Sequence, residues 1–210
     1  MMIDGFGIGL YSPRVAARIA RIRYQSFQAW AKTHLLHPIR FTVDHRGENT
    51  YTFRDLLLIR LIVRLKAAGA RPKAIRTALD TITLMSDGNR DAWMQSMIVV
   101  SSSMVIAVIP GRPEWNPVAA SKGPQKMAVV FFPELIEELK EELVPPDKFP
   151  HVEIDPQVVG GAPIIKGTRI STRAVTAVKE SGENPREAYP LLTDEQIANA
   201  EAYEEFLKVA

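Results

Sequence analysis

The stretch "SPRVAARIARIRYQSFQAWAKTH" (residues 12–34) predicts two short helices joined by a brief turn. Ser12 is a suitable cap for the first helix, and Pro13 suits its first turn. Apolar residues recur at helical spacing in both halves of the stretch: Val15, Ala16, Ile19, Phe27 and Trp30. Two short helices around a brief turn are the outline of a helix-turn-helix.

The residues that follow predict a β-hairpin and then a long helix. In residues 39–43, apolar and polar residues alternate as in a half-buried strand. "HRGEN" (45–49) reads as the turn and "TYTF" (50–53) as the return strand, which together form a wing. "TFRDLLLIRLIVRLKAAGA" (52–70) predicts a helix that is capped by Thr52 with Asp55 and ends at Gly69, and residues 71–85 predict another.

The rest of the chain divides into a β-rich middle and a turn-rich tail. Strands are expected at 97–100, 104–109 and 126–132, a helix at 133–143, and a proline-rich linker at 144–150. Helices are expected at 172–182, 184–192 and 193–210, the last with a Thr193–Gln196 capping box. We therefore expect an α+β protein with a winged helix-turn-helix in 1–90, a small β/α segment in 91–149 and a separate domain in 150–210.

Charge is distributed unevenly along the chain. Residues 1–90 carry 15 basic and 6 acidic side chains, whereas residues 91–210 carry 11 basic and 18 acidic ones. The basic front suits a polyanion such as nucleic acid, and the acidic rear favours a different partner. The absence of cysteine excludes disulfides and thiolate sites. The most apolar stretch, residues 97–109, is interrupted by three serines and is too short to span a membrane, so we expect a cytoplasmic protein with no membrane partner.

A glycine-rich stretch in the tail, "GGAPIIKGTRIS" (160–171), invites comparison with phosphate-binding loops. In such loops the lysine follows the last glycine and a helix begins at once. Here Lys166 precedes Gly167, and the residues between the glycines are strand-like. Turns between short strands, with glycine at positive φ, are the favoured interpretation.

The tail resembles a small domain that was long known only as a domain of unknown function and is now grouped with VapB-type antitoxins. The resemblance covers about 60 residues and rests on the stretch from Asp155 to Ile170 and on the segment from Tyr189 to Tyr203. It implies a helix-turn-helix-like fold for residues 150–210. It also implies a VapC-type partner, a toxin with a PIN-like ribonuclease fold.

The front half is similar, more loosely, to the winged helix of MerR-like regulators, across roughly residues 10–83. In that class the second helix enters the major groove and the wing contacts the DNA backbone. Two sets of residues follow from the resemblance. Near bases or phosphates we expect Arg23, Tyr24, Gln25, Ser26 and Gln28. Near phosphates alone we expect Arg14, Arg18, Arg40 and Arg46.

These features predict a DNA-binding antitoxin that acts as a homodimer on operator DNA and silences a toxin ribonuclease. Basic residues of the acidic rear domain are candidates to pair with acids in the toxin's site: Lys166, Arg169 and Arg173. Apolar occlusion by the last helix, through Tyr203 and Phe206, would serve as well. For Arg169 the alternative is a structural bond to backbone carbonyls.

A ligand-sensing MerR-like transcriptional regulator is the alternative function. Its pocket would lie in the middle segment and be lined by aromatic residues: Trp93, Trp115, Phe131 and Phe132. Plain core packing also accounts for them. We expect no enzyme, cofactor or metal, because the histidines at 34, 37, 45 and 151 are scattered and no catalytic spacing is recognisable.

Overall fold

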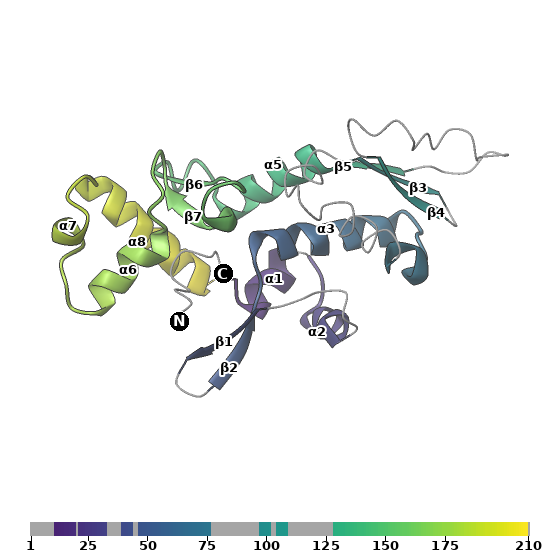
Figure 1. Ribbon diagram of the computed structural model, residues 1–210, viewed down its shortest axis with the longest axis horizontal. Coiled ribbons are helices and arrows are strands. Elements are labelled where there is room, and N and C mark those ends of the chain that lie inside the picture. The colour runs from purple at the N-terminus through teal and green to yellow at the C-terminus, as the bar shows by residue number, and fades with distance from the viewer. Residues whose placement is uncertain are drawn as a thin grey trace. The chain divides into compact units, whose positions relative to one another are not determined.

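The computed structural model describes residues 11–19, 21–32, 39–43, 46–76, 97–101, 104–108 and 128–209 (Figure 1). The chain forms two compact units. The first combines residues 1–56 with 140–210, and the second comprises residues 57–139. The limits of these units differ from the domain boundaries expected at residues 90 and 149. The division into three domains stays a prediction.

The first two helices are α1 (Pro13–Ile19) and α2 (Tyr24–Lys32), as the sequence predicts. The backbone N–H of Val15 donates to the Ser12 hydroxyl at 3.3 Å, so Ser12 caps α1. Arg21 lies in the turn between the helices with φ +54°, a conformation in which glycine is usual. The turn is closed by the N–H of Ile22, which donates to the Ala17 carbonyl at 3.1 Å.

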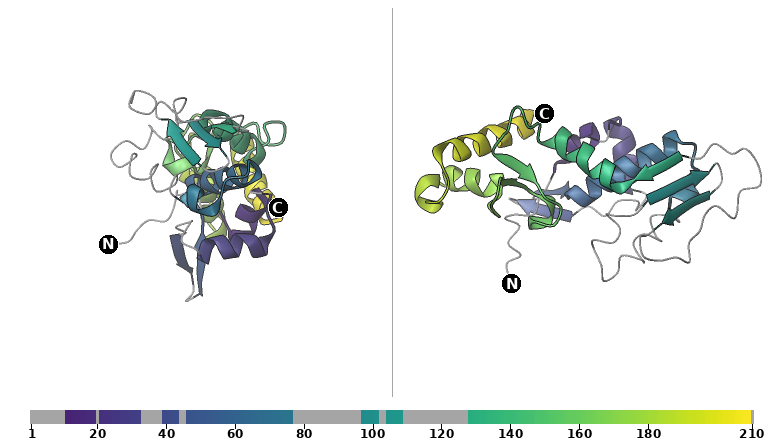
Figure 2. Two further views of the ribbon diagram at one scale, coloured as in Figure 1. Left: turned by 90° about the vertical axis from the view of Figure 1, so that its right-hand side faces the viewer. Right: turned by 90° about the horizontal axis from the view of Figure 1, so that it is seen from above.

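An antiparallel hairpin follows, formed by β1 (Ile39–Val43) and β2 (Arg46–Thr50). It projects beyond α1 and α2 in both Figure 1 and Figure 2. The hairpin confirms the wing, but the predicted position of its return strand is wrong. Val43 pairs with Arg46, so "RGEN" belongs to the strand and only Thr50 of "TYTF" does. A glycine among polar residues is typical of a turn, but here these residues pair with β1, so composition alone misplaced the turn.

Helix α3 (Phe53–Ala67) confirms the predicted caps. The Asp55 carboxylate accepts bonds from both the N–H and the hydroxyl of Thr52, each at 2.8 Å. The Asp55 N–H donates to the Thr52 hydroxyl at 3.2 Å, which completes the capping box. Gly69 ends the helix with φ +87°. Residues 72–76 are helical, and the rest of the helix predicted for 71–85 lies outside the described residues.

The middle of the chain contains a three-stranded antiparallel sheet and one helix. The strands β3 (Met97–Ser101), β4 (Met104–Val108) and β5 (Ala128–Phe131) are ordered β4-β3-β5. Helix α5 (Phe132–Leu143) buries one apolar face and exposes its glutamates except Glu142, which is half-buried. Arg64 of α3 pairs with Glu138 of α5 within the second unit. The predicted strands and helix are thus confirmed to within a few residues.

The tail pairs β6 (Val152–Ile154) with β7 (Pro163–Ile165) across a 3₁₀ turn at Val159–Gly161. Three helices follow: α6 (Thr172–Glu180), α7 (Pro185–Ala188) and α8 (Asp194–Val209). Their shared core is formed by Ile165, Val175, Leu192 and Ala200, with Ile170, Tyr189 and Ile197 against it. Most of these residues belong to the pattern that carries the resemblance to VapB-type antitoxins, so that pattern specifies packing.

The stretch expected to be a linker, residues 144–150, is packed against this domain. Val144 and Phe149 are each only 6% exposed. The Phe149 ring lies 5.1 Å from Tyr203 and 5.2 Å from Phe206, both on α8. The prolines correctly predict that α5 ends before residue 144. They do not make the segment a free linker, because Phe149, between Pro146 and Pro150, anchors it to α8. Among the described residues, no helix is both long and apolar enough to cross a bilayer.

Candidate nucleic-acid interface and partner surface

Helix α2 has one buried anchor and one exposed polar face. Phe27 is fully buried, and its ring meets the Tyr51 ring edge-on at 4.8 Å. The predicted DNA-contacting residues of this helix and the position before it are all exposed: Arg23, Tyr24, Gln25, Ser26 and Gln28. The anchor fixes the rotation of the helix, and the exposed side offers a guanidinium, two carboxamides and two hydroxyls. Such groups can bond to base edges and phosphates.

The four arginines predicted to face phosphates have different surroundings. Arg14 is exposed on α1. Arg18 lies on the same helix with its guanidinium carbon 5.9 Å from the centre of the Phe206 ring, a cation–π contact. Partial burial lowers the pKa of Arg18, although Tyr203 opposes that shift. Arg40 and Arg46 occupy opposite strands of the wing, in register with Asn49 and Val43.

The stretch 160–171 is a structural turn. The Thr168 hydroxyl donates to the Ile165 carbonyl at 2.8 Å and accepts the Ile170 N–H at 3.0 Å, which closes the turn between β7 and α6. Gly167 has φ +76°, and its N–H donates to a Glu153 carboxylate oxygen at 2.8 Å. A carboxylate at this position repels phosphate, so the structure supports the interpretation as a turn.

The residues predicted to contact a toxin are only partly available at the surface. Lys166 and Arg169 are exposed on the turn. Arg173 is exposed but forms a two-point pair with Glu180, at 3.0 and 2.9 Å. Tyr203 is fully buried, so in this conformation it contributes to the core and not to a surface that a partner can reach. Phe206 is half-buried beneath Arg18 and Lys148.

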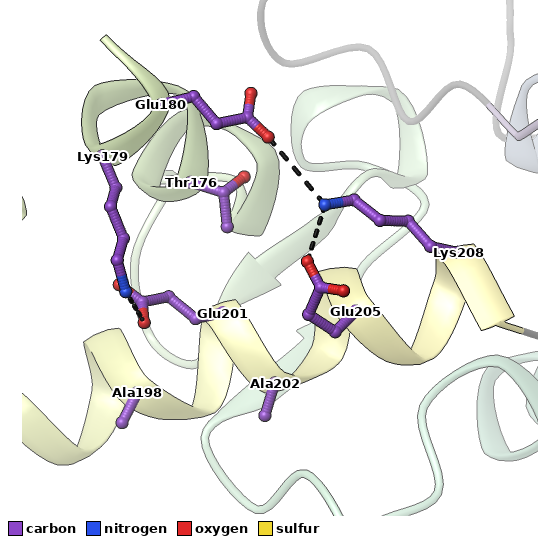
Figure 3. Close-up of a pocket in the computed structure, with 8 residues that line it drawn as sticks. All are labelled: Thr176, Lys179, Glu180, Ala198, Glu201, Ala202, Glu205 and Lys208. Carbon is purple, nitrogen blue, oxygen red and sulfur yellow. Dashed lines mark hydrogen bonds and ion pairs between the residues drawn. The ribbon is translucent and has the colours of Figure 1, made fainter. Parts of the chain in front are cut away.

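A shallow groove of about 620 Å³ runs between α6 and α8 (Figure 3). Its charged side chains pair with one another. Lys179 bonds to Glu201 at 2.6 Å, and Lys208 bonds to Glu205 at 2.6 Å and lies 4.0 Å from Glu180. Because these charges are mutually neutralised, the groove is poorly suited to hold a small charged ligand.

Two contacts between distant parts of the chain were not foreseen from the sequence. A Cβ built on Gly161 would lie 2.7 Å from Phe53 Cβ, so the turn before β7 rests directly on the first residue of α3. In the second contact Tyr11 lies close enough to Tyr203 to raise the pKa of its hydroxyl. Both hydroxyls are buried and have no hydrogen-bond partner among the described residues. Glu204, also buried, accepts a bond from Thr172. No local signal marks such contacts, because their members are far apart in sequence.

The residues of the alternative ligand pocket are largely outside the described chain. Trp93 and Trp115 are not described, and of Phe131 only the backbone in β5 is. Phe132 is fully buried at the start of α5. Across the ranges that the structure covers, no three acidic or histidine side chains gather as a metal site requires.

This geometry defines a winged helix-turn-helix protein with a small α-helical tail domain. Residues 11–82 match the family described as "MerR HTH family regulatory protein", and residues 152–203 match "Protein of unknown function (DUF433)". The chain therefore carries a MerR-type helix-turn-helix and a DUF433 domain.

Curated relatives support the first of these assignments. The "Uncharacterized HTH-type transcriptional regulator Mb1861" of Mycobacterium bovis is 34% identical over 85 residues, which are 35% of this chain and 38% of that protein. The Mycobacterium tuberculosis regulators MT1879 and Rv1830 match to the same extent. The chain thus spans well under half the length of these relatives. A crystal structure of Rv2018 from Mycobacterium tuberculosis covers 93% of this chain and 98% of its own, with 18% identity and a TM-score of 0.36, at which the likeness says nothing about the fold.

Proposed function

We propose that the chain is a DNA-binding transcriptional regulator that reads its operator through α2 and holds the DNA backbone through the wing. The observation that carries this proposal is the exposed polar face of α2, which is fixed in rotation by buried Phe27. The basic charge of residues 1–90 and the likeness to helix-turn-helix regulators support it. A homodimer fits this role, because one small reading head makes few base contacts.

A gel-shift titration tests DNA binding. The probe is a duplex from the region upstream of the chain's own gene, compared with an unrelated duplex of equal length at two salt concentrations. Phosphate contacts predict that affinity falls steeply with salt. Arg23→Glu and Gln25→Ala should each weaken binding to the upstream duplex about tenfold or more. Leu191→Ala, a change at an exposed position in the tail domain, is the matched control. Equal binding of both duplexes by the wild type would contradict operator recognition.

The finer proposal is that this regulator is the antitoxin of a type II toxin–antitoxin pair. The support is the resemblance of the tail to VapB-type antitoxins and the presence of exposed Lys166 and Arg169 on an acidic domain. If the toxin holds a metal among clustered acidic side chains, two exposed cations on this turn can pair with those acids. The partner would then be bound by the tail domain while the front binds DNA.

Coexpression with a PIN-like ribonuclease encoded beside the gene tests this role. The wild type should copurify with the nuclease and suppress its cleavage of RNA. The double charge reversal Lys166→Glu/Arg169→Glu should release active nuclease and leave DNA binding intact. Lys179→Glu, on the rim of the groove, is a control that reverses one charge elsewhere on the same domain. Recovery of a free, uninhibited nuclease with the wild-type chain would refute the antitoxin role.

A further inference from the structure

We propose that the tail domain positions the DNA-contacting elements, and that Gly161 is the positioning residue at the point of contact. This inference rests on the proposed function, since it concerns how the operator-binding surface is held. It assigns to the DUF433 domain a role in DNA recognition that is separate from partner binding.

The contact at Gly161 leaves no room for any side chain. A Cβ there would lie 2.7, 2.9 and 3.1 Å from Cβ, Cγ and Cδ1 of Phe53. Gly161 also has φ +79°, a conformation that other residues adopt only with strain. The neighbouring Gly160 has a similar φ of +64°, yet nothing lies within 4 Å of its added Cβ. Of these two glycines, only Gly161 is required by the contact with Phe53.

Phe53 is linked to both DNA-contacting elements through Tyr51, two residues before it in the chain. The Tyr11 N–H donates to the Tyr51 carbonyl at 2.8 Å, and the Tyr51 N–H donates back to the Tyr11 carbonyl at 3.0 Å. Thr50, the residue before Tyr51, pairs with Ile39 and closes the base of the wing. The Tyr51 ring packs on Phe27 of α2. The turn at Gly161 therefore contacts Phe53, which is two residues along the chain from Tyr51, the residue that packs on α2 beside the base of the wing.

A second contact joins α1 to the tail domain. Arg18 lies over the ring of Phe206 on α8, and the hydroxyls of Tyr11 and Tyr203 are both buried. Tyr11 bonds to Tyr51 through its backbone, and its buried side chain lies near α8, because Glu204 contributes to raising the pKa of Tyr11. Two separate contacts from the tail thus constrain α1, the base of the wing and the start of α3. A displacement of the tail domain must move the surface that meets DNA.

The experiment compares Gly161→Ala with Gly160→Ala, which lose the same conformational freedom but differ in the collision with Phe53. Binding is measured to the upstream duplex and to an unrelated duplex of equal length. Gly161→Ala should weaken binding to the upstream duplex about tenfold and leave the unrelated duplex unchanged within twofold, because misplaced elements lose base contacts before phosphate contacts. Gly160→Ala should change neither by more than about twofold. Phe206→Ala, with no backbone change, should weaken specific binding about threefold.

Amide hydrogen exchange of the DNA-free protein supplies a second measurement. The amides of Tyr11 and Tyr51 should exchange faster in Gly161→Ala than in Gly160→Ala, since the contact that supports their mutual bonds is lost. Equal exchange in the two variants, or equal loss of binding to both duplexes, would overturn the positioning role. If the wild type prefers neither duplex, operator recognition fails, and the exchange result still decides whether the tail holds Tyr11 and Tyr51.

Discussion

Removing the hydroxyl of Tyr203 should stabilise the protein. Tyr203 is fully buried, and its hydroxyl has no hydrogen-bond partner among the described residues. Burial raises the pKa of Tyr203 well above its ordinary value, and the nearby Tyr11 and Glu204 raise it further. The group is therefore neutral at any pH near 7. It pays the cost of leaving water and gains no bond in return.

The size of the effect follows from that imbalance. A buried hydroxyl without a partner costs about 1–3 kcal/mol, whereas its removal leaves the ring packing on Phe149 in place. Part of the gain is lost to the small space left behind, so Tyr203→Phe should raise the free energy of unfolding by about 1 kcal/mol. For a chain of this length the melting temperature should rise by about 2–4 °C.

Urea unfolding followed by far-UV circular dichroism at pH 7 measures this difference. Tyr189→Phe is the matched control, because Tyr189 is only half-buried against the tail core and its hydroxyl reaches water more easily. It should change stability by less than about 0.5 kcal/mol. A loss of 1 kcal/mol or more in Tyr203→Phe would refute the reasoning and show that the hydroxyl is bonded in solution. The double variant with Tyr11→Phe should then report whether both hydroxyls share that bond.

Three further changes test the local structure. Glu204→Gln keeps an acceptor for Thr172 and removes a carboxyl whose pKa burial raises above its usual value. The stability that comes from the protonated carboxyl is present at low pH and is lost as the pH rises through the folded pKa. The variant should therefore be more stable than the wild type in urea unfolding at pH 7 and lose that advantage toward pH 4. Arg21→Gly relieves the positive φ at the turn of the helix-turn-helix and removes only an exposed pair with Glu142, so thermal unfolding should show a gain of about 0.5 kcal/mol, and a loss would mean that the ion pair dominates. Thr193→Ala removes the hydroxyl that accepts the Gln196 N–H at 3.2 Å and should cost about 1 kcal/mol in urea unfolding, whereas Ser181→Ala at the end of α6 should cost less than half as much.

Local rules predicted the elements whose determinants are close in sequence. The caps at Ser12, Thr52 and Thr193 each depend on residues within one helical turn, and all three form as expected. The residues that carry the family resemblance of the tail include Ile165, Leu192 and Ala200, which form one core in the structure. Caps depend on residues that lie close together in the sequence, so their spacing alone predicts them.

Features that depend on distant partners were missed. The return strand of the wing was misplaced because Gly47 signals a turn locally, while pairing with β1 makes it part of a strand. Phe149 was assigned to a linker, because its packing partners, the rings of Tyr203 and Phe206, lie more than fifty residues away in the sequence. The residues of α2 expected to contact DNA are exposed, and their contact with DNA stays a prediction. The packing of α2 on Tyr51, two residues before the Phe53 that Gly161 contacts, had no local signal in the sequence.

The first compact unit joins the beginning of the chain to its end, and this has a consequence for biosynthesis. Gly161 meets Phe53 only after the ribosome has added more than one hundred residues beyond Phe53. Until then Tyr11 lacks its neighbours on α8, and Arg18 of α1 lacks the Phe206 ring, so the nascent helix-turn-helix is more open to chaperones and proteases. A transcript truncated before α8 should therefore yield a short-lived fragment and not a free DNA-binding head.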